Sequence, residues 1–334
     1  MAMEPSGRVV VEQIAHDALR DNPLGDPWIR SIPVYLPPGY DAGDHRYPVI
    51  YWLHGFGGTG IGQITPHPWT PSLPELMDRV IRDGAAPALL VMADGWTRYG
   101  GSQYVNSSAN GRYEDAVREL VGHVDSRFRT LASADHRGID GKSSGGYGAL
   151  ALGMRNPDLF GGMASHSGDL YFEACFQVGF WKAADTVRKH GGLAAFLAAF
   201  ERAPKKPEEM TRALATLVAM AMAYSPNPDG PHGFDLPIDL ETGEIVEAVW
   251  ARWQAQDPVR MVERCAEGLR AMRLIYFECG SRDQFNGHFG ARMLHRRLEQ
   301  LGLAHEYQEF DDDHSGVNYR YVESLRRLCT ALAP

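Results

Sequence analysis

Short apolar runs alternate with segments of helical periodicity along most of this chain, and this pattern limits the folds that it can adopt. The segment 113–128, for example, has apolar residues at helical spacing and lies between two such runs. We expect the apolar runs to form strands at residues 49–53, 88–92, 137–140, 160–165, 274–278 and 305–310. Strands that alternate with helices predict a mostly parallel central sheet with helices on both faces. Two further strands, at 9–15 and 28–36, precede the alternation and are expected to be antiparallel.

The alternation is interrupted between residues 169 and 262. This stretch is mostly helical in pattern and contains a turn-rich patch at 225–231. A segment of this length is too long to be a loop between two strands, so it should be a folded insertion. We therefore expect an α/β core made of residues 1–168 and 263–334, with residues 169–262 as a helical cap on it.

A candidate nucleophile lies directly after the expected strand 137–140. The residues from Gly141 to Gly145 fit the pattern G-x-S-x-G, with Ser143 in its centre. Between a strand and a helix, this pattern forms a strained turn that lifts the serine hydroxyl to the top of the sheet. Glycines flank the serine because a side chain there would collide with the neighbouring strand and helix. The alternative is a glycine-rich turn that only connects a strand to a helix.

A serine hydroxyl is a weak nucleophile until a base takes its proton, and the base is commonly oriented by a carboxylate. His314 follows the last expected strand and is the candidate base, although a histidine in this acidic loop could also be a surface residue. Asp283 follows the strand 274–278 and is the favoured acid, with Asp169 as its main rival. The aspartates beside His314 more often solvate a loop than bind a metal, so we expect no metal and no cofactor.

Attack of the serine on an ester carbonyl would create an oxyanion that two backbone N–H groups must stabilise. We expect one from Ser144, the residue after the nucleophile, and one from Phe56 in the glycine-rich loop 54–58. His54 in that loop is expected to be structural.

Residues that follow another core strand should reach the rim of the pocket. We expect Trp96, Tyr104 and Asn106 to contact the substrate there. Some of the large apolar residues of the cap must also face the crevice, which favours an apolar or aromatic group on the substrate.

Several motifs together resemble the esterase D family, which includes S-formylglutathione hydrolases, feruloyl and acetyl-xylan esterases, enterochelin esterases and mycolyltransferases. The motifs are Val34-Tyr35-Leu36-Pro37-Pro38-Gly39-Tyr40-Asp41, Leu53-His54-Gly55, Gly141-x-Ser143-x-Gly145-Gly146, Gly280-x-x-Asp283 and Asp313-His314. The resemblance covers roughly residues 8–168 and 270–330. It implies an α/β-hydrolase fold, a Ser143–Asp283–His314 triad, and oxyanion donors at Phe56 and Ser144.

The chain departs from this family at two places. Members often have His and Met beside the serine, where this chain has Lys142 and Ser144. The expected cap is not shared with the small members of the family, so their substrates cannot be transferred to this chain.

Composition excludes some classes of partner. A formal net charge of −9 leaves no basic surplus for binding nucleic acid. No apolar run approaches the length of a membrane span, and no signal-peptide pattern is seen at the start of the sequence.

The four cysteines form no CxxC pair, which favours free thiols in a reducing compartment, and we expect a cytoplasmic protein. A homo-oligomer is compatible with the sequence, but no feature requires it.

The leading interpretation is a serine esterase that hydrolyses a small ester through an acyl-enzyme. Three alternatives stay open at this point: an acyltransferase with the same triad, a peptidase, and a non-catalytic binding protein on a hydrolase scaffold.

Overall fold

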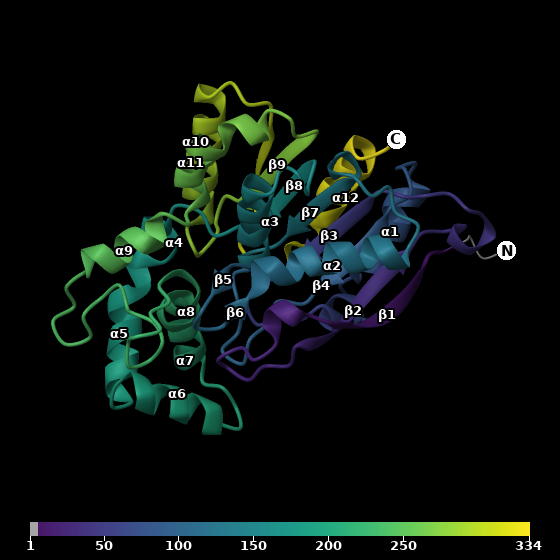
Figure 1. Cartoon of the computed structure of the whole chain (residues 1–334). Coiled ribbons are helices and arrows are strands. Elements are labelled where there is room, and N and C mark those ends of the chain that lie inside the picture. The colour runs from purple at the N-terminus through teal and green to yellow at the C-terminus, as the bar shows by residue number, and fades with distance from the viewer. Residues whose placement is uncertain (1–5) are drawn as a thin grey trace.

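The computed structural model describes residues 6–334, and its centre is one large sheet (Figure 1). The strands of this sheet follow the order β1-β2-β4-β3-β7-β8-β9-β10. They are β1 (Arg8–Ala15), β2 (Ile29–Leu36), β4 (Leu89–Ala93), β3 (Val49–Leu53), β7 (Arg137–Gly141), β8 (Gly162–His166), β9 (Leu274–Gly280) and β10 (Glu306–Phe310). β1 pairs antiparallel with β2, and β2 with β4, whereas all later neighbours are parallel. The expected mostly parallel sheet is confirmed.

The central strands read as continuous apolar runs because both faces of the sheet are covered by helices. In β3, Ile50 and Trp52 face one apolar core, while Val49, Tyr51 and Leu53 face the other. This division follows from the alternation of side chains along a strand. The helices that contribute to the two cores are α1 (Leu73–Arg82) and α12 (Tyr321–Ala331) on one side, and α2 (Tyr113–Arg127), α3 (Ser144–Arg155) and α11 (Gly287–Gln300) on the other. The sheet is thus held between two helical layers.

β8 begins two residues later than the sequence pattern indicates. The N–H of Phe160 bonds to the carbonyl of Asn156 in a turn, and the N–H of Gly161 bonds to Ala134 and Arg137. Because the N–H groups of Phe160 and Gly161 make these bonds, they do not pair with β9, and the pairing of β8 with β9 begins at Gly162. A short two-stranded sheet, β5 (Asn106–Ser107) with β6 (Gly111–Arg112), lies in the long connection after β4.

The stretch between β8 and β9 is helical, and most of it lies to one side of the sheet (Figure 1). Its elements are α4 (Phe172–Cys175), α5 (Phe180–Lys189), α6 (Leu193–Arg202), α7 (Glu208–Ala213), the π-helical turn η6 (Leu214–Val218), α8 (Ala219–Tyr224), α9 (Glu247–Gln254) and α10 (Pro258–Leu269). The expected boundary at residue 262 falls inside α10, which packs against α3 and α11 of the core. The division into core and cap domains stays a prediction.

An aromatic cluster fills the interior of this helical stretch. The ring of the fully buried Trp253 packs against Phe180 and Tyr224, with centroid distances of 5.3 and 5.4 Å, and its indole N–H donates to Ser225 at 2.9 Å. Aromatic side chains of this size contribute a large share of the apolar area in a core. Large apolar residues here are therefore mainly interior packing, as their helical spacing predicts.

None of the helices within residues 6–334 combines the length and the apolar character that a membrane span requires.

Candidate active site

Ser143 occupies a strained turn between β7 and α3. Its φ is 59° and its ψ is −124°, a combination that costs a non-glycine residue conformational energy. The backbone of neighbouring elements leaves no room for a side chain at Gly141 or at Gly145, which lie on either side of Ser143. A Cβ added at Gly145 would lie 1.9 Å from the carbonyl oxygen of Leu53, and one at Gly141 would lie 2.4 Å from the carbonyl oxygen of Gly145. The turn therefore presents the serine hydroxyl beyond the end of the strand.

The hydroxyl of Ser143 meets a buried histidine and a buried carboxylate. Nε2 of His314 lies 2.9 Å from Oγ of Ser143, and Nδ1 of His314 lies 2.7 Å from Oδ2 of Asp283. His314 is 6% exposed and Asp283 is 3% exposed, so both are shielded from competing water. With its Nδ1–H donated to Asp283, the imidazole has Nε2 free to accept the serine proton.

Asp283 is held in its charged form. Burial opposes its negative charge, but the hydrogen bond from His314 and the N–H of Phe285, which donates to Oδ1 at 2.8 Å, outweigh that effect. The pKa of Asp283 is consequently below its ordinary value. An ionised carboxylate here orients the imidazole and would stabilise an imidazolium.

The loops that carry Asp283 and His314 interlock. The N–H of His314 donates to Oε1 of Gln284 at 3.0 Å, and the N–H of Arg282 donates to the carbonyl of Asp312 at 3.0 Å. A Cβ at Gly280 would lie 2.5 Å from that same carbonyl oxygen. Close backbone approach therefore fixes the distance between the acid and the base.

The two backbone N–H groups expected to stabilise an oxyanion lie beside Ser143. Ser144 begins α3, and the first amides of a helix have no acceptor within it. In the loop after β3, a Cβ at Gly55 would lie 3.3 Å from Cβ of Ser143. The N–H of Phe56 has no acceptor in residues 6–334, whereas that of Gly57 donates to the carbonyl of Gly100. Both groups are available to a ligand at Ser143.

His54 anchors this loop. Its Nε2 accepts the N–H of Gly95 at 2.9 Å, and its Nδ1 lies 2.9 Å from the carbonyl of Gly55. Burial lowers the pKa of His54, which favours the neutral ring that these two bonds require. The two hydrogen bonds of His54 thus hold the loop that carries Phe56 in place.

The rival acid Asp169 also lies in the pocket, but it does not contact His314. Its Oδ2 accepts from Nε2 of Gln103 at 3.0 Å and from Oγ of Ser144 at 3.4 Å. Burial raises the pKa of Asp169. The structure therefore brings Asp283, and not Asp169, to the imidazole.

The three residues expected to contact the substrate are placed elsewhere, and this prediction is corrected. Tyr104 is buried and donates its hydroxyl to the carbonyl of His54 at 2.8 Å. Asn106 bonds to Asp115 on the exposed side of α2, and the carbonyl of Trp96 accepts the hydroxyl of a buried tyrosine. None of Trp96, Tyr104 and Asn106 lines the pocket at Ser143. The connection after β4 folds back along α2, so its side chains support the pocket from outside.

The family is shown by comparison with known proteins. A model of the family described as "Putative esterase" matches residues 27–325. The chain belongs to this esterase family. The resemblance to esterases expected from the sequence motifs is thereby confirmed.

Two curated proteins are similar to part of this esterase-family chain. An endo-1,4-beta-xylanase/feruloyl esterase of Xylanibacter ruminicola is 32% identical over 144 residues, which are 41% of this chain and 19% of that protein. An esterase of Mycobacterium tuberculosis is 33% identical over 146 residues, which are 42% of this chain and 29% of that protein. The chain thus matches less than a third of the length of these relatives.

Solved structures show the same fold over the whole chain. A ferulic acid esterase has a TM-score of 0.65 at 17% identity and covers 99% of this chain and 100% of its own. An S-formylglutathione hydrolase from Agrobacterium tumefaciens has a TM-score of 0.62 at 14% identity, with coverages of 99% and 97%. This esterase-family member has the α/β-hydrolase fold.

The pocket at Ser143 has a volume of about 380 Å³ and includes residues that sequence analysis did not assign to it. Lys142 lines it, and burial lowers the pKa of this lysine. One feature of the sequence indicated that Lys142 could belong to the pocket: relatives often have a histidine at this position, and this chain does not. Phe285 lies with its ring 4.6 Å from the imidazole of His314. Thr211 and Arg212 of α7 also line the pocket, and helical periodicity alone did not indicate which side of that helix would face Ser143.

Proposed function

We propose that this protein is a serine carboxylic-ester hydrolase with Ser143 as nucleophile, His314 as base and Asp283 as the residue that orients the base. The observation that carries the proposal is the continuous chain of hydrogen bonds from Asp283 through His314 to Ser143, which opens on a pocket. Membership of the esterase family supports the same reaction.

In the first step, Oγ of Ser143 attacks the ester carbonyl as Nε2 of His314 takes its proton. The carbonyl oxygen becomes negatively charged and accepts hydrogen bonds from the N–H groups of Phe56 and Ser144. Asp283 stabilises the imidazolium. The tetrahedral intermediate then collapses, the bond from carbon to the alcohol oxygen breaks, and the imidazolium gives its proton to the departing alcohol.

In the second step, water takes the place of the alcohol. Nε2 of His314 removes a proton from the water as its oxygen attacks the acyl carbon, and the same N–H groups receive the oxyanion. The bond from the acyl carbon to Oγ of Ser143 breaks, and the proton returns to the serine. The products are a carboxylic acid and free enzyme.

The substrate class follows from the shape and lining of the pocket. About 380 Å³ accommodates a small ester, and the rings of Phe176 and Phe285 contribute apolar surface. The proposal is therefore a small ester with an apolar or aromatic group. Similarity to proteins named feruloyl esterases is in line with this class.

The proposal includes a cytoplasmic location. The four cysteines are free thiols, and free thiols are typical of a reducing compartment. Cell fractionation with a cytoplasmic marker tests it.

The substitution Ser143→Ala tests the proposal directly. It should abolish turnover of short p-nitrophenyl esters and labelling by a fluorophosphonate, because the nucleophile is lost. The melting temperature should hardly change, since alanine keeps the Cβ. Ser126→Ala, an exposed serine in α2, is the matched control and should keep full activity. Full ester turnover by the Ser143→Ala variant would refute the assignment.

Two of the alternative functions are distinguished in the same assay. Added alcohols would convert the acyl group into new esters if the protein were an acyltransferase, so the ratio of acid to ester product separates the two reactions. A panel of matched amides tests peptidase action, and hydrolysis of esters with no cleavage of amides is the expected result.

A further inference from the structure

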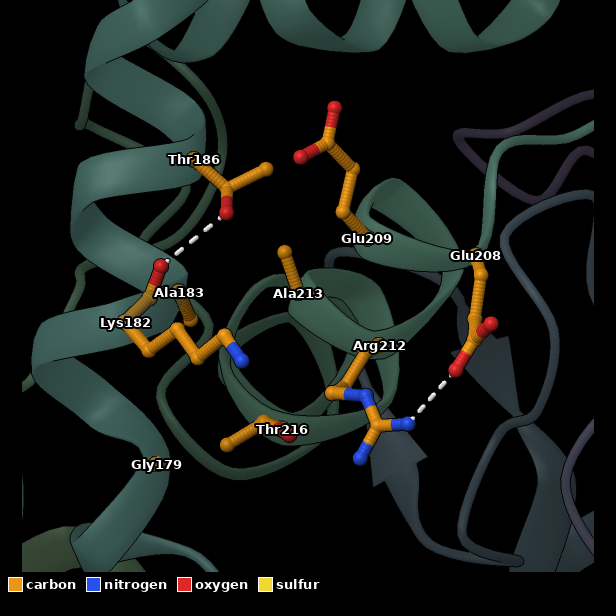
Figure 2. Close-up of a pocket in the computed structure, with 9 residues that line it drawn as sticks. All are labelled: Gly179, Lys182, Ala183, Thr186, Glu208, Glu209, Arg212, Ala213 and Thr216. Atoms are coloured by element: carbon orange, nitrogen blue, oxygen red, sulfur yellow. Dashed lines mark hydrogen bonds and ion pairs between the residues drawn. The ribbon is translucent and has the colours of Figure 1, made fainter.

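A second pocket lies beside the one at Ser143, in the helical stretch between β8 and β9. We call it the outer pocket; it is enclosed by α5 on one side and by α7 and η6 on the other (Figure 2), and its volume is about 460 Å³. Glu208, Arg212 and Thr216 line both pockets. The side chains of one helical segment thus form the wall between the two, and the outer pocket adjoins the site of ester cleavage.

Two cationic side chains face the outer pocket. The ammonium of Lys182 has no hydrogen-bond or ion-pair partner within residues 6–334. Figure 2 shows it directed into the space between α5 and α7, toward the same region as the guanidinium of Arg212. Arg212 uses one nitrogen to donate to Glu208 at 2.7 Å, and these side chains are 57% and 86% exposed. Such an exposed pair contributes little to stability, so Arg212 is free to exchange this partner for an anionic ligand.

The acidic residue Glu209 limits how much negative charge the outer pocket can take. Its carboxylate is directed to the end away from Arg212 (Figure 2). Lys182, Arg212, Glu208 and Glu209 carry two positive and two negative charges, so the outer pocket is electrically neutral before a ligand binds. One negative charge can lie near Lys182 and Arg212, whereas a second would approach Glu209 and be repelled. This arrangement fits a carboxylate better than a phosphate.

The wall between the pockets has an unusual backbone. Thr216 lies in η6, a π-helical turn, and this conformation is rare and frequently marks functional sites. The opposing residue on the α5 side is Gly179, where a Cβ would lie 2.6 Å from Cγ2 of Thr216. Gly179 and Thr216 are therefore in close contact, and the lack of a side chain at Gly179 allows the start of α5 to approach η6 this closely.

We propose that the outer pocket is a subsite for a carboxylate at the end of the ester substrate remote from the bond that is cleaved, bound by Lys182 and Arg212. This inference rests on the proposed esterase function and names its substrate class: esters that carry a free carboxylate. Because Arg212 and Thr216 line both pockets, a substrate that is held at Ser143 and extends past these side chains would reach the outer pocket.

The test compares esters that differ only in this charge. The substrates are p-nitrophenyl monoesters of dicarboxylic acids from succinate to sebacate and the matching neutral carboxamides. For the chain length that reaches the outer pocket, kcat/KM should be higher for the carboxylate than for the carboxamide. Lys182→Met should lower this ratio about tenfold, because a charge-assisted hydrogen bond is lost. Lys182→Arg should restore most of it.

Lys189→Met is the matched control, since Lys189 is an exposed lysine of the same helix and does not line the outer pocket. It removes the same charge and should keep the wild-type ratio. Equal ratios in Lys182→Met and Lys189→Met, or no preference for the carboxylate at any length, would overturn the subsite.

Failure of the esterase function is recognised separately, because wild-type protein would then leave the neutral carboxamide esters intact. A measurement that needs no turnover is calorimetric titration of the Ser143→Ala variant with the best carboxylate ester. Its Kd should rise about tenfold when Lys182→Met is added. An unchanged Kd would contradict the subsite.

Discussion

At the scale of single residues, the backbone around Ser143 is strained, and its neighbours hold it in that state. Its φ of 59° is of a kind that costs about 1–3 kcal/mol. The N–H of Ser143 donates to the carbonyl of His166, and the carbonyl of Ser143 accepts the N–H of Tyr147, each at 2.9 Å. These bonds tie the residue to β8 and to α3. The position of the nucleophile is therefore set by secondary structure on both sides of it.

The role of Asp283 can be tested by a substitution that keeps its shape. Asp283→Asn should lower kcat for p-nitrophenyl esters by about 10³–10⁴-fold, because an amide cannot stabilise the imidazolium and favours the wrong tautomer of His314. Steady-state kinetics measure the loss. KM should change much less than kcat, since the pocket itself is unaltered.

Asp169→Asn is the comparison for that experiment. Its carboxylate bonds to Gln103 and Ser144 and not to His314, so we expect a loss of less than about tenfold. If the losses in the two variants were reversed, Asp169 would be the orienting acid.

At the scale of elements, the connection from β7 to α3 depends on close backbone contact. Gly145 approaches the carbonyl of Leu53 so closely that no side chain fits between α3 and β3. Beneath this turn, a buried network extends from His166 to Glu278 and Ser324, with nitrogen-to-oxygen distances of 2.8 and 2.7 Å. His166 is thus a structural histidine at the end of β8. It supports the elements that carry the nucleophile and takes no part in the pocket.

The prediction for this connection compares two glycines in helices. Gly145→Ala should reduce the free energy of unfolding by at least about 3 kcal/mol, because the added methyl overlaps the backbone of β3. Gly122→Ala in α2 should raise it by about 0.5–1 kcal/mol, because a Cβ at this exposed position meets nothing within 4 Å and alanine favours the helix. Urea denaturation measures both values. Equal effects of the two substitutions would disprove the steric explanation.

At the scale of the whole molecule, stability should depend on pH through buried ionisable groups. Burial, with a contribution from Arg30, lowers the pKa of His16 from 6.5 to about 4. Between these values the unfolded chain binds a proton that the folded protein excludes, so this contribution to stability is complete above pH 6.5 and is lost as the pH falls toward 4. Asp140 and Asp257, whose pKa burial raises to about 6, act in the opposite direction.

The substitution His16→Gln isolates the first effect. The difference in the free energy of unfolding between wild type and variant should shift by about 2–3 kcal/mol between neutral pH and pH 4, with the wild type losing more. Urea denaturation at a series of pH values measures it. His67→Gln, at an exposed histidine, should leave the wild-type pH dependence in place. The same slope in both variants would exclude His16 as its source.

Features that depend on short-range sterics and periodicity could be predicted from the amino-acid sequence. The alternation of apolar runs and helices predicted the parallel sheet, since side-chain periods of 2 and 3.6 residues are local properties. The glycines around Ser143 predicted the tight turn, because a clash between adjacent elements depends only on the presence of a Cβ. Candidates for the base and the acid could be named from their positions after late strands, because the carboxyl ends of parallel strands share one edge of a sheet.

Which of these side chains come into contact depends on the three-dimensional packing of the chain. Asp283 and Asp169 were both possible acids by position, and the interlocked loops after β9 and β10 bring Asp283 to His314. Tyr104 was expected at the rim of the pocket, but its side chain is buried and its hydroxyl donates to the carbonyl of His54. The outer pocket arises where α5 meets α7, and nothing in either helix alone indicates that they are neighbours. Loop paths and helix contacts depend on the packing of distant segments, which local sequence patterns do not encode.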